Sequence, residues 1–286
     1  MSIERFFILA NRAKDKDHQF SEKVSAFLQE RGKICQVLYT EEERRGVREQ
    51  LRISADCLLV LGGDGTVLEA AHICAGTGTP ILGINLGNLG YLAEIDSNSW
   101  KEALLCVLEG SYEIESRMML DGSVSGPDLY MYPETYGHAL NDIVVTRGSG
   151  LQILQFNVYV DGQFLNRYNA DGVIISTATG STAYNMSAGG PIVEPKARLI
   201  LMTPISPHTL NNRSIILSSS DKIVIEMLPP RNGKELSAEC FFDGGSGVSL
   251  KSGDRINISS SVGTTRLIRI RKQSFLQTLH RKFYSI

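Results

Sequence analysis

The sequence predicts a two-domain fold, in which an α/β domain is followed by an all-β, sandwich-like domain. Strand and helix signals alternate through the first third of the chain, whereas strands dominate after Tyr112. A length of 286 residues also suits two domains of moderate size better than one small domain. We expect the α/β domain at residues 1–111, the β-sandwich-like domain at 112–268, and a tail at 269–286 that packs back on the α/β domain.

The α/β domain is predicted from short apolar runs separated by helical patterns. Four apolar runs have the length of buried strands, at residues 6–10, 34–38, 57–61 and 80–85. Apolar residues recur at helical spacing at residues 24–28, 66–75 and 100–108. This alternation is typical of a parallel, Rossmann-like sheet with helices on both of its faces.

The second domain is predicted from an apolar–polar alternation with a period of two residues. The alternation is clearest at residues 156–160, 222–226 and 255–258. Clusters of Gly, Ser, Asn and Asp separate such runs and are typical of turns. Many short strands with turns between them favour a β-sandwich. In the tail, Phe275, Leu279 and Phe283 recur at helical spacing, which predicts a final helix.

Charge and cysteine content narrow the possible partners. The formal net charge of −2 gives no global basic field, so we expect neither nucleic acid nor an anionic membrane as a partner. The five cysteines are scattered and form no C-x-x-C pair, which favours reduced thiols in a cytoplasmic protein. No apolar run reaches the roughly 18 residues of a membrane-spanning segment.

A glycine-rich turn gives the strongest chemical signal. The segment L-G-G-D-G-T at residues 61–66 lies where an apolar strand ends and a helix begins. Ligands bind at this edge of an α/β sheet, and glycines let backbone N–H groups approach a phosphate at a helix N-terminus. Asp64 then either holds Mg²⁺ or accepts a proton from an attacking hydroxyl. A role for Asp64 as a simple helix cap does not require glycines on both sides.

This turn resembles the one shared by NAD kinases and by diacylglycerol- or sphingosine-type lipid kinases. In these families G-G-D-G-T is followed by an apolar helix, and phosphofructokinases carry a related glycine–aspartate turn. The resemblance implies phosphoryl transfer but leaves the acceptor open. The sequence contains no G-x-x-x-x-G-K-[ST] loop and no H-R-D or D-F-G motif, so other kinase classes are not indicated.

Further segments resemble NAD kinases in particular. They are G-I-N-L-G-N-L-G-Y-L at residues 83–92, L-N-D-I-V-V at 140–145, D-G-V-I-I-S-T-A-T-G-S-T-A-Y-N-M-S-A-G-G-P at 171–191, and P-I-S-P-H-T-L-N-N-R at 204–213. Taken alone, the first is compatible with a plain glycine-rich loop and the second with an ordinary turn. The third is the most specific, because four of the six residues at 177–182 are Thr or Ser, which a simple strand–loop–helix does not explain.

The resemblance implies a role for each matched residue. Asp64 is expected to be the catalytic base, and Gly62, Gly63 and Gly65 are expected to cradle phosphates. NAD is expected to be bound by Asn141, Asp142, Asn169, Asp171, Thr179, Thr182, Ala183, Tyr184, Asn185 and Ser187. Short hydroxyl side chains suit hydrogen bonds to a base and a ribose, and the Tyr184 ring offers a flat face to an aromatic group.

The implied reaction is transfer of a phosphoryl group from ATP or polyphosphate to the adenosine 2′-hydroxyl of NAD, giving NADP. Mg²⁺ is expected to bridge the donor phosphates, because the sequence shows no carboxylate or histidine cluster with metal-ligand spacing. We therefore assign no protein residue as a dedicated metal ligand. The resemblance also implies a homodimer or homotetramer.

Two departures from the family pattern and two rival functions remain. Gly245 stands where many relatives carry Gln, and Asn169 stands where some carry a basic residue.

One rival function is that of a lipid kinase with the same glycine turn, which predicts a hydrophobic acceptor channel and membrane affinity. The other is a non-catalytic NAD-binding sensor, which does not need the chemistry of Asp64.

Overall fold

The computed structural model describes residues 3–39, 41–87, 90–93, 95–126, 135–148, 153–208, 213–230, 235–270 and 274–284. Its contacts divide the chain into two compact units. The first, here called the α/β unit, comprises Met1–Arg117 and Gly263–Ile286, and the second, the β unit, comprises Met118–Val262. Asn88, Leu89 and residues 209–212, which belong to two of the family-like segments, lie outside the described residues.

A parallel sheet forms the centre of the α/β unit. Its strands are β1 (Arg5–Ala10), β2 (Ile34–Leu38), β3 (Cys57–Gly62), β4 (Ile81–Asn85) and β5 (Ile95–Asp96). The order is β2-β1-β3-β4, and β5 pairs with β4. Each of these pairings is parallel. Strand β3 is buried along its whole length, as expected for a central strand that is covered on both faces.

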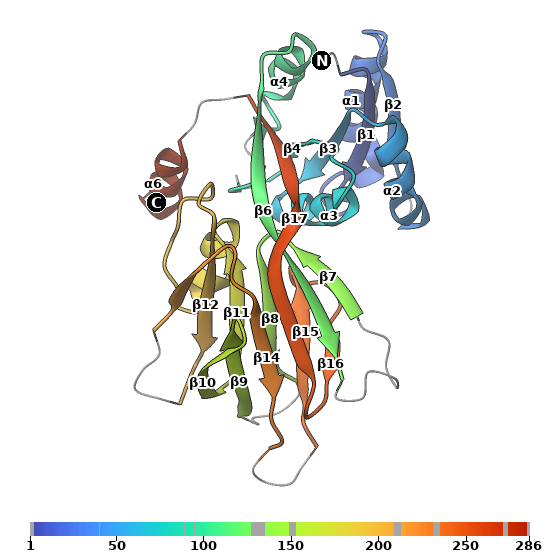
Figure 1. Ribbon diagram of the computed structural model, residues 1–286. Helices are drawn as coiled ribbons and strands as arrows, with labels where there is room; N and C mark the ends of the chain where they lie inside the picture. Colours follow the sequence, from blue (N-terminus) through green and yellow to red (C-terminus); the bar gives the residue numbers. More distant parts are fainter. Residues whose placement is uncertain are drawn as a thin grey trace. The chain divides into compact units, whose positions relative to one another are not determined.

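Helices cover this sheet (Figure 1). They are α1 (Gln19–Gln29), α2 (Glu41–Ser54), α3 (Asp64–Cys74) and α4 (Trp100–Leu108), with a short 3₁₀ turn, η1 (Lys16–His18), before α1. Helix α1 packs on β1 and β2, whereas α3 packs on β3 and β4. The last helix, α6 (Phe275–Tyr284), also belongs to the α/β unit, and its Lys282 Nζ lies 4.7 Å from the centroid of the Tyr91 ring.

The β unit is built from antiparallel strands. Its elements are β7 (Thr135–Ala139), β8 (Asp142–Arg147), β9 (Leu154–Val160), β10 (Gln163–Ala170), β11 (Gly172–Thr177), η2 (Thr179–Thr182), α5 (Tyr184–Ser187), β12 (Leu199–Ile205), β13 (Ile215–Ser218), β14 (Ile223–Met227), β15 (Ala238–Phe242) and β16 (Val248–Leu250). One sheet has the order β13-β12-β11-β8-β15-β16. The other contains β10, β9 and β14, and apolar side chains from both sheets form one core that includes Phe156, Ile175 and Ile225.

Two long strands continue from one unit into the other. They are β6 (Glu113–Ser125), which crosses the division after Arg117, and β17 (Arg255–Arg269), which crosses it after Val262. In the β unit, β17 pairs with β14, and in the α/β unit its Leu267 lies beside Ile81 of β4. The chain therefore enters and leaves the β unit through extended backbone.

The predicted fold class is confirmed. The first unit has the parallel sheet with helices, the second has the antiparallel sandwich, and the tail contacts the first unit. The structural division falls a few residues away from residues 111 and 268, so the exact domain boundaries stay a prediction. Among the described residues, no helix has the length and apolar character that a membrane crossing requires.

Candidate active site

The glycine turn lies between β3 and α3, as the motif predicts. Gly63 occupies the position before the helix in an extended conformation, and Asp64 is the first helical residue. The Asp64 carboxylate does not cap the helix. It accepts hydrogen bonds from the backbone of the loop that follows β4: Tyr91 N–H donates to Oδ2 at 2.8 Å, and Leu92 and Ala93 N–H donate to Oδ1 at 3.0 and 3.2 Å. The helix-cap alternative for Asp64 is therefore excluded.

Two glycines allow the close packing around this carboxylate. A Cβ atom on Gly62 would lie 2.3 Å from Thr66 Oγ1, which is far inside van der Waals contact. A Cβ atom on Gly90 would lie 1.8 Å from Asp64 Oδ1. Gly90 therefore gives the carboxylate the space it occupies, and Gly62 does the same for the first turn of α3. Gly65, by contrast, has no atom within 4 Å of the corresponding position.

Sequence reasoning missed a lysine beside this turn. Lys14 Nζ lies 3.0 Å from the position of a Cβ on Gly63 and 3.2 Å from that of a Cβ on Gly87. The loop that carries Lys14 follows β1 and is held by Asn11, whose Oδ1 accepts the Lys14 N–H and whose Nδ2 donates to Thr66 Oγ1. The ammonium group thus lies over two glycine segments at the carboxyl edge of the sheet, where a phosphate would need a positive charge. The one available signal in the sequence was the position of Lys14 just after a predicted strand.

A pocket of about 380 Å³ lies in the β unit. It is lined by Asn141, Asp142, Val144, Thr146, Ala183, Tyr184, Phe241, Asp243 and Gly244. Four of these residues, Asn141, Asp142, Ala183 and Tyr184, belong to the predicted NAD site. Register brings them together, because Asp142 at the start of β8 pairs with Ser176 near the end of β11, directly before the η2–α5 segment.

Asp243 organises the backbone at one end of this pocket. Its Oδ2 accepts the N–H of Leu140 at 2.7 Å, and its Oδ1 accepts the N–H groups of Asn141 at 2.7 Å and Asp142 at 3.0 Å. Asp243 has a φ of 49° and Gly244 a φ of 68°, as in a tight hairpin turn. Sequence reasoning considered this turn only for the departure at Gly245 and missed Asp243, whose partners lie about a hundred residues away in the chain.

Asp142 is 5% exposed, and its carboxyl lies close to the charge of Asp243. Burial, and then the nearby Asp243 carboxylate, raise the pKa of Asp142 from 3.8 to about 7. At neutral pH this group is therefore poised to either donate or accept a hydrogen bond.

The Thr- and Ser-rich segment supports the pocket from behind. Thr177 Oγ1 donates to the Leu140 carbonyl at 2.6 Å, and Ser176 Oγ donates to the Asn141 carbonyl at 3.1 Å. A Cβ on Gly180 would lie 2.3 Å from that same Asn141 oxygen. The hydroxyls of Ser176 and Thr177 thus fix the backbone of Asn141. Direct contacts of NAD with the other hydroxyls of the segment stay predictions.

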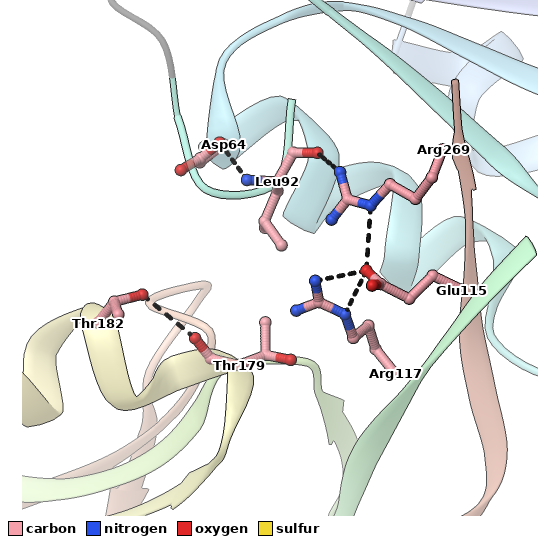
Figure 2. A network of polar contacts seen from close by, with 7 residues as sticks. All are labelled: Asp64, Leu92, Glu115, Arg117, Thr179, Thr182 and Arg269. Atoms are coloured by element: carbon pink, nitrogen blue, oxygen red, sulfur yellow. Dashed lines mark hydrogen bonds and ion pairs between the residues drawn. The ribbon is translucent and has the colours of Figure 1, made fainter. Parts of the chain in front are cut away.

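The remaining residues of the segment have different surroundings. Thr182 Oγ1 donates to the Thr179 carbonyl at 3.5 Å (Figure 2). The Asn185 side chain is fully buried, where its Nδ2 donates to the Pro191 carbonyl and its Oδ1 accepts the Thr203 hydroxyl. Tyr184 is 44% exposed, and Ser187 is also exposed. The structure thus presents the Tyr184 ring to solvent and engages the Asn185 amide inside the protein.

Asn169 and Asp171 lie apart from Asn141. Along β11, Gly172 pairs with Thr146 and Ser176 with Asp142, so Asn169 and Asp171, which precede Gly172, are at the end of the strand away from Asp142. Asp171 Oδ1 is ion-paired with Arg147 Nε at 3.3 Å, and Asn169 Oδ1 accepts a hydrogen bond from the Gln155 amide. Neither residue is among those that line the pocket.

Comparison with known proteins gives the family. Residues 6–112 match the family model described as the ATP-NAD kinase N-terminal domain, and residues 140–270 match the ATP-NAD kinase C-terminal domain. An NAD kinase from Lachnospira eligens is 41% identical over 296 residues, which cover 98% of this chain and all of the relative. An NAD kinase from Agathobacter rectalis is 40% identical, with 98% of each chain covered.

Solved structures agree with these sequence matches. The crystal structure of yeast NADH kinase complexed with NADH superposes with a TM-score of 0.90 at 25% identity, covering 100% of this chain and 89% of that one. The structure of an NAD kinase from Archaeoglobus fulgidus in complex with ATP gives a TM-score of 0.77 at 25% identity, covering 99% of each chain. By its sequence matches over both units, this chain belongs to the NAD kinase family.

Proposed function

We propose that this chain phosphorylates the adenosine 2′-hydroxyl of NAD to form NADP, with ATP or polyphosphate as donor and Asp64 as general base. The observation that carries the proposal is the Asp64 carboxylate, which is held by three backbone N–H groups at a glycine turn suited to phosphates. The relatives that share about 40% identity over nearly the whole chain are NAD kinases, which supports this acceptor.

The geometry of Asp64 leaves one position open for a substrate hydroxyl. A carboxylate has about four lone-pair sites, two on each oxygen. From the described residues Oδ1 accepts two N–H groups and Oδ2 accepts one, which leaves a second acceptor site on Oδ2 for the substrate. In the proposed step Oδ2 takes the proton of the 2′-hydroxyl, and the 2′-oxygen of NAD forms a bond to the terminal phosphorus of the donor. The bond from that phosphorus to the bridging oxygen breaks, and the remaining donor phosphate leaves with its electrons.

The donor phosphates would bind at the carboxyl edge of the parallel sheet. The backbone of Gly62, Gly63 and Gly65 and the N-terminus of α3 would supply N–H groups, and Lys14 would supply a positive charge. This arrangement favours a chain of phosphates, which both ATP and polyphosphate provide. The structural relative from Archaeoglobus fulgidus holds ATP, which supports ATP as one donor.

The residues of the turn fit a Mg²⁺ ion that is held mainly by phosphates. Mg²⁺ in phosphoryl-transfer sites is usually bound through one or two carboxylates plus substrate phosphates. Among the described residues no group of three or more His, Cys, Asp or Glu forms a metal site, and the remaining position of Asp64 Oδ2 is assigned to the substrate hydroxyl, so the phosphates would supply the ligands of the ion. When bound, the ion would neutralise charge on the transferring phosphates.

The NAD adenosine would bind in the pocket of the β unit. Asn141 and Asp142 offer donors and acceptors, and Ala183 and the exposed Tyr184 ring supply apolar surface. Direct contacts of NAD with Asn169, Asp171, Thr179, Thr182 and Ser187 stay predictions. For Asn185 the buried amide favours a role in holding the loop instead.

Two rival functions require structural features that differ from those described here. A lipid kinase needs an apolar acceptor channel, whereas the pocket of the β unit carries Asn141, Asp142 and Asp243. A non-catalytic sensor has no use for an oriented Asp64 carboxylate. The homo-oligomeric state and the cytoplasmic location stay predictions.

An enzyme-coupled assay tests the function. Purified protein, NAD and Mg²⁺ are mixed with ATP, with polyphosphate or with no donor, and NADP is measured with an NADP-specific dehydrogenase. We expect NADP with at least one donor and none without. NAD binding without NADP from any donor would favour the sensor, and phosphorylation of diacylglycerol or sphingosine without NAD binding would favour the lipid kinase.

A further inference from the structure

The loop that holds Asp64 is itself held by an ion network. Residues 91–93 form no helix or strand, although their N–H groups position the Asp64 carboxylate. The Leu92 carbonyl of this loop accepts a hydrogen bond from Arg269 Nη1 at 3.1 Å (Figure 2). Arg269 is the last residue of β17, so it comes from a part of the chain about 180 residues away.

One peptide unit connects Arg269 with Asp64. The Leu92 carbonyl and the Ala93 N–H belong to the same peptide group, and no peptide bond of the described chain is cis. In a trans peptide the C=O and N–H point in opposite directions. Arg269 therefore donates to the carbonyl of this peptide, and the N–H on its opposite side donates to Asp64 Oδ1. A cation on the carbonyl also polarises the peptide and strengthens the bond that its N–H donates.

Arg269 is fixed in turn by Glu115 of β6. Arg269 Nε donates to Glu115 Oε1 at 3.0 Å, and Arg117 Nε donates to the same oxygen at 2.9 Å. The three side chains are 13%, 16% and 5% exposed for Arg269, Glu115 and Arg117. Burial alone would raise the pKa of Glu115, but the charges of Arg117 and Arg269 outweigh it and hold the pKa below its ordinary value. The network is thus ionised and largely shielded from water, which limits its screening by salt.

We propose that Arg269 and Glu115 are positioning residues for phosphoryl transfer, which orient the Asp64 carboxylate through the Leu92–Ala93 peptide. This inference rests on the proposed role of Asp64 as base. Arg269 fixes the peptide that binds Oδ1, and Glu115 fixes Arg269. Because the Leu92 and Ala93 N–H groups hold Oδ1, the carboxylate cannot rotate, and the lone pair of Oδ2 stays directed at the substrate hydroxyl. Loss of the network leaves Asp64 present but poorly aimed, which lowers the rate of the chemical step without removing a contact to either substrate.

The test compares two arginines of the same strand. Arg266 also lies on β17 and donates to a backbone carbonyl, that of Gly78 at 2.8 Å, but Gly78 lies in the connection between α3 and β4 and not in the loop that holds Asp64. We expect Arg269→Gln to lower kcat about 10-fold or more, with the KM values for NAD and ATP changed less than twofold. Arg266→Gln is expected to change neither kcat nor the KM values for NAD and ATP. Arg269→Lys, which keeps the charge, is expected to recover part of the loss, and Glu115→Gln is expected to show a smaller loss.

Two further readouts separate positioning from general damage. In an Asp64→Asn background, Arg269→Gln is expected to lower kcat by less than twofold, since it acts through Asp64. Hydrogen exchange of the Ala93 amide is expected to quicken severalfold in Arg269→Gln but not in Arg266→Gln. Equal losses of kcat in the two arginine variants, a full additive loss with Asp64→Asn, or unchanged Ala93 exchange would each overturn the proposal. If the unmodified protein makes no NADP, the proposed function fails, while the exchange comparison still decides whether the network holds the loop.

Discussion

At the scale of single residues, the position of the Asp64 carboxylate depends on Gly90 having no side chain. The nearest Asp64 oxygen lies 1.8 Å from where a Gly90 Cβ would be, so any other residue at position 90 must displace it. The same kind of requirement holds for Gly180 at the Asn141 carbonyl. These glycines are needed for close approach and have no positive φ, so conformational strain does not explain them.

We predict that Gly90→Ala lowers kcat about 100-fold, because a displacement of about 1 Å at a catalytic group costs that much. The new methyl group pushes the carboxylate away from the N–H groups that orient it. Steady-state kinetics with NAD and ATP measure the loss. Gly46→Ala is the matched control, because Gly46 lies in helix α2 with no atom within 4 Å of the new methyl group. An active Gly90→Ala enzyme would contradict the close packing described here.

A second prediction at this scale concerns Asp142. Its pKa in the folded protein is about 7 against an ordinary value of 3.8, so folding favours its protonated form. The stability that comes with the proton is complete below about pH 4 and is lost as the pH rises through 7. Relative to Asp142→Asn, the native protein should lose about 2–3 kcal/mol of unfolding free energy between pH 5 and pH 8. Urea unfolding at both pH values measures the difference, and an equal pH dependence of the two proteins would show that Asp142 has an ordinary pKa.

At the scale of elements, strand ends build both sites. The ends of β1, β3 and β4 bring Lys14, the glycine turn and the loop before β5 to one edge of the α/β unit. In the β unit, the start of β8 meets the end of β11 and the turn after β15. Each site is therefore formed by loops and turns, and the strands and helices that they connect hold them in position.

The turn after β15 gives a prediction for NAD binding. Asp243→Asn keeps a residue that tolerates the left-handed backbone but loses a carboxylate oxygen that accepts N–H groups at residues 140–142. We expect the KM for NAD to rise about 10-fold, since bonds to a charged acceptor are worth about 1.5–3 kcal/mol each. The control is Asp161→Asn. Asp161 has the same φ of 49°, precedes a glycine and accepts the Lys222 N–H, but it lies in the turn between β9 and β10. Equal effects of the two substitutions on KM would contradict a specific role for Asp243.

The loop after β1 gives a prediction for donor binding. Lys14→Gln is expected to raise the KM for ATP about 10-fold and to leave the KM for NAD within twofold, since it removes a charge beside the phosphates. The effect should shrink at high salt, which screens an exposed cation. Lys16→Gln, two residues further along, serves as the control. A loss of NAD affinity with unchanged ATP affinity would place Lys14 at the other substrate.

At the scale of the whole molecule, exposed apolar side chains at sheet edges favour self-association. Phe164 on the edge strand β10 and Ile216 on the edge strand β13 are each 57% exposed. Large apolar residues exposed on edge strands are commonly covered by another chain. We predict a particle of two or four times the 31.4 kDa of one chain. Light scattering during gel filtration measures this mass, and a stable particle of single-chain mass would contradict the prediction.

The sequence predicted the fold class and the position of Asp64, because both follow from local patterns. A strand that runs into G-G-D-G-T specifies the turn without reference to distant residues. Lys14, Asp243 and Arg269 were missed, since each acts on a segment far away in the chain and none belongs to a local motif. The roles of Ser176 and Thr177 in holding the backbone of residues 140 and 141 were missed for a related reason. Composition shows that a hydroxyl is present but does not show that a backbone carbonyl already occupies it.

The most direct test of the central claim is the turnover of Asp64→Asn. This substitution keeps the size of the side chain and removes its ability to take a proton. NAD affinity is measured beside it by calorimetry, with thermal unfolding as the check on folding. The account predicts a fall in kcat of about 10²–10⁴-fold with NAD affinity within threefold of the unmodified protein. A folded variant that binds NAD and turns over within about tenfold of the unmodified rate would show that Asp64 is not the general base.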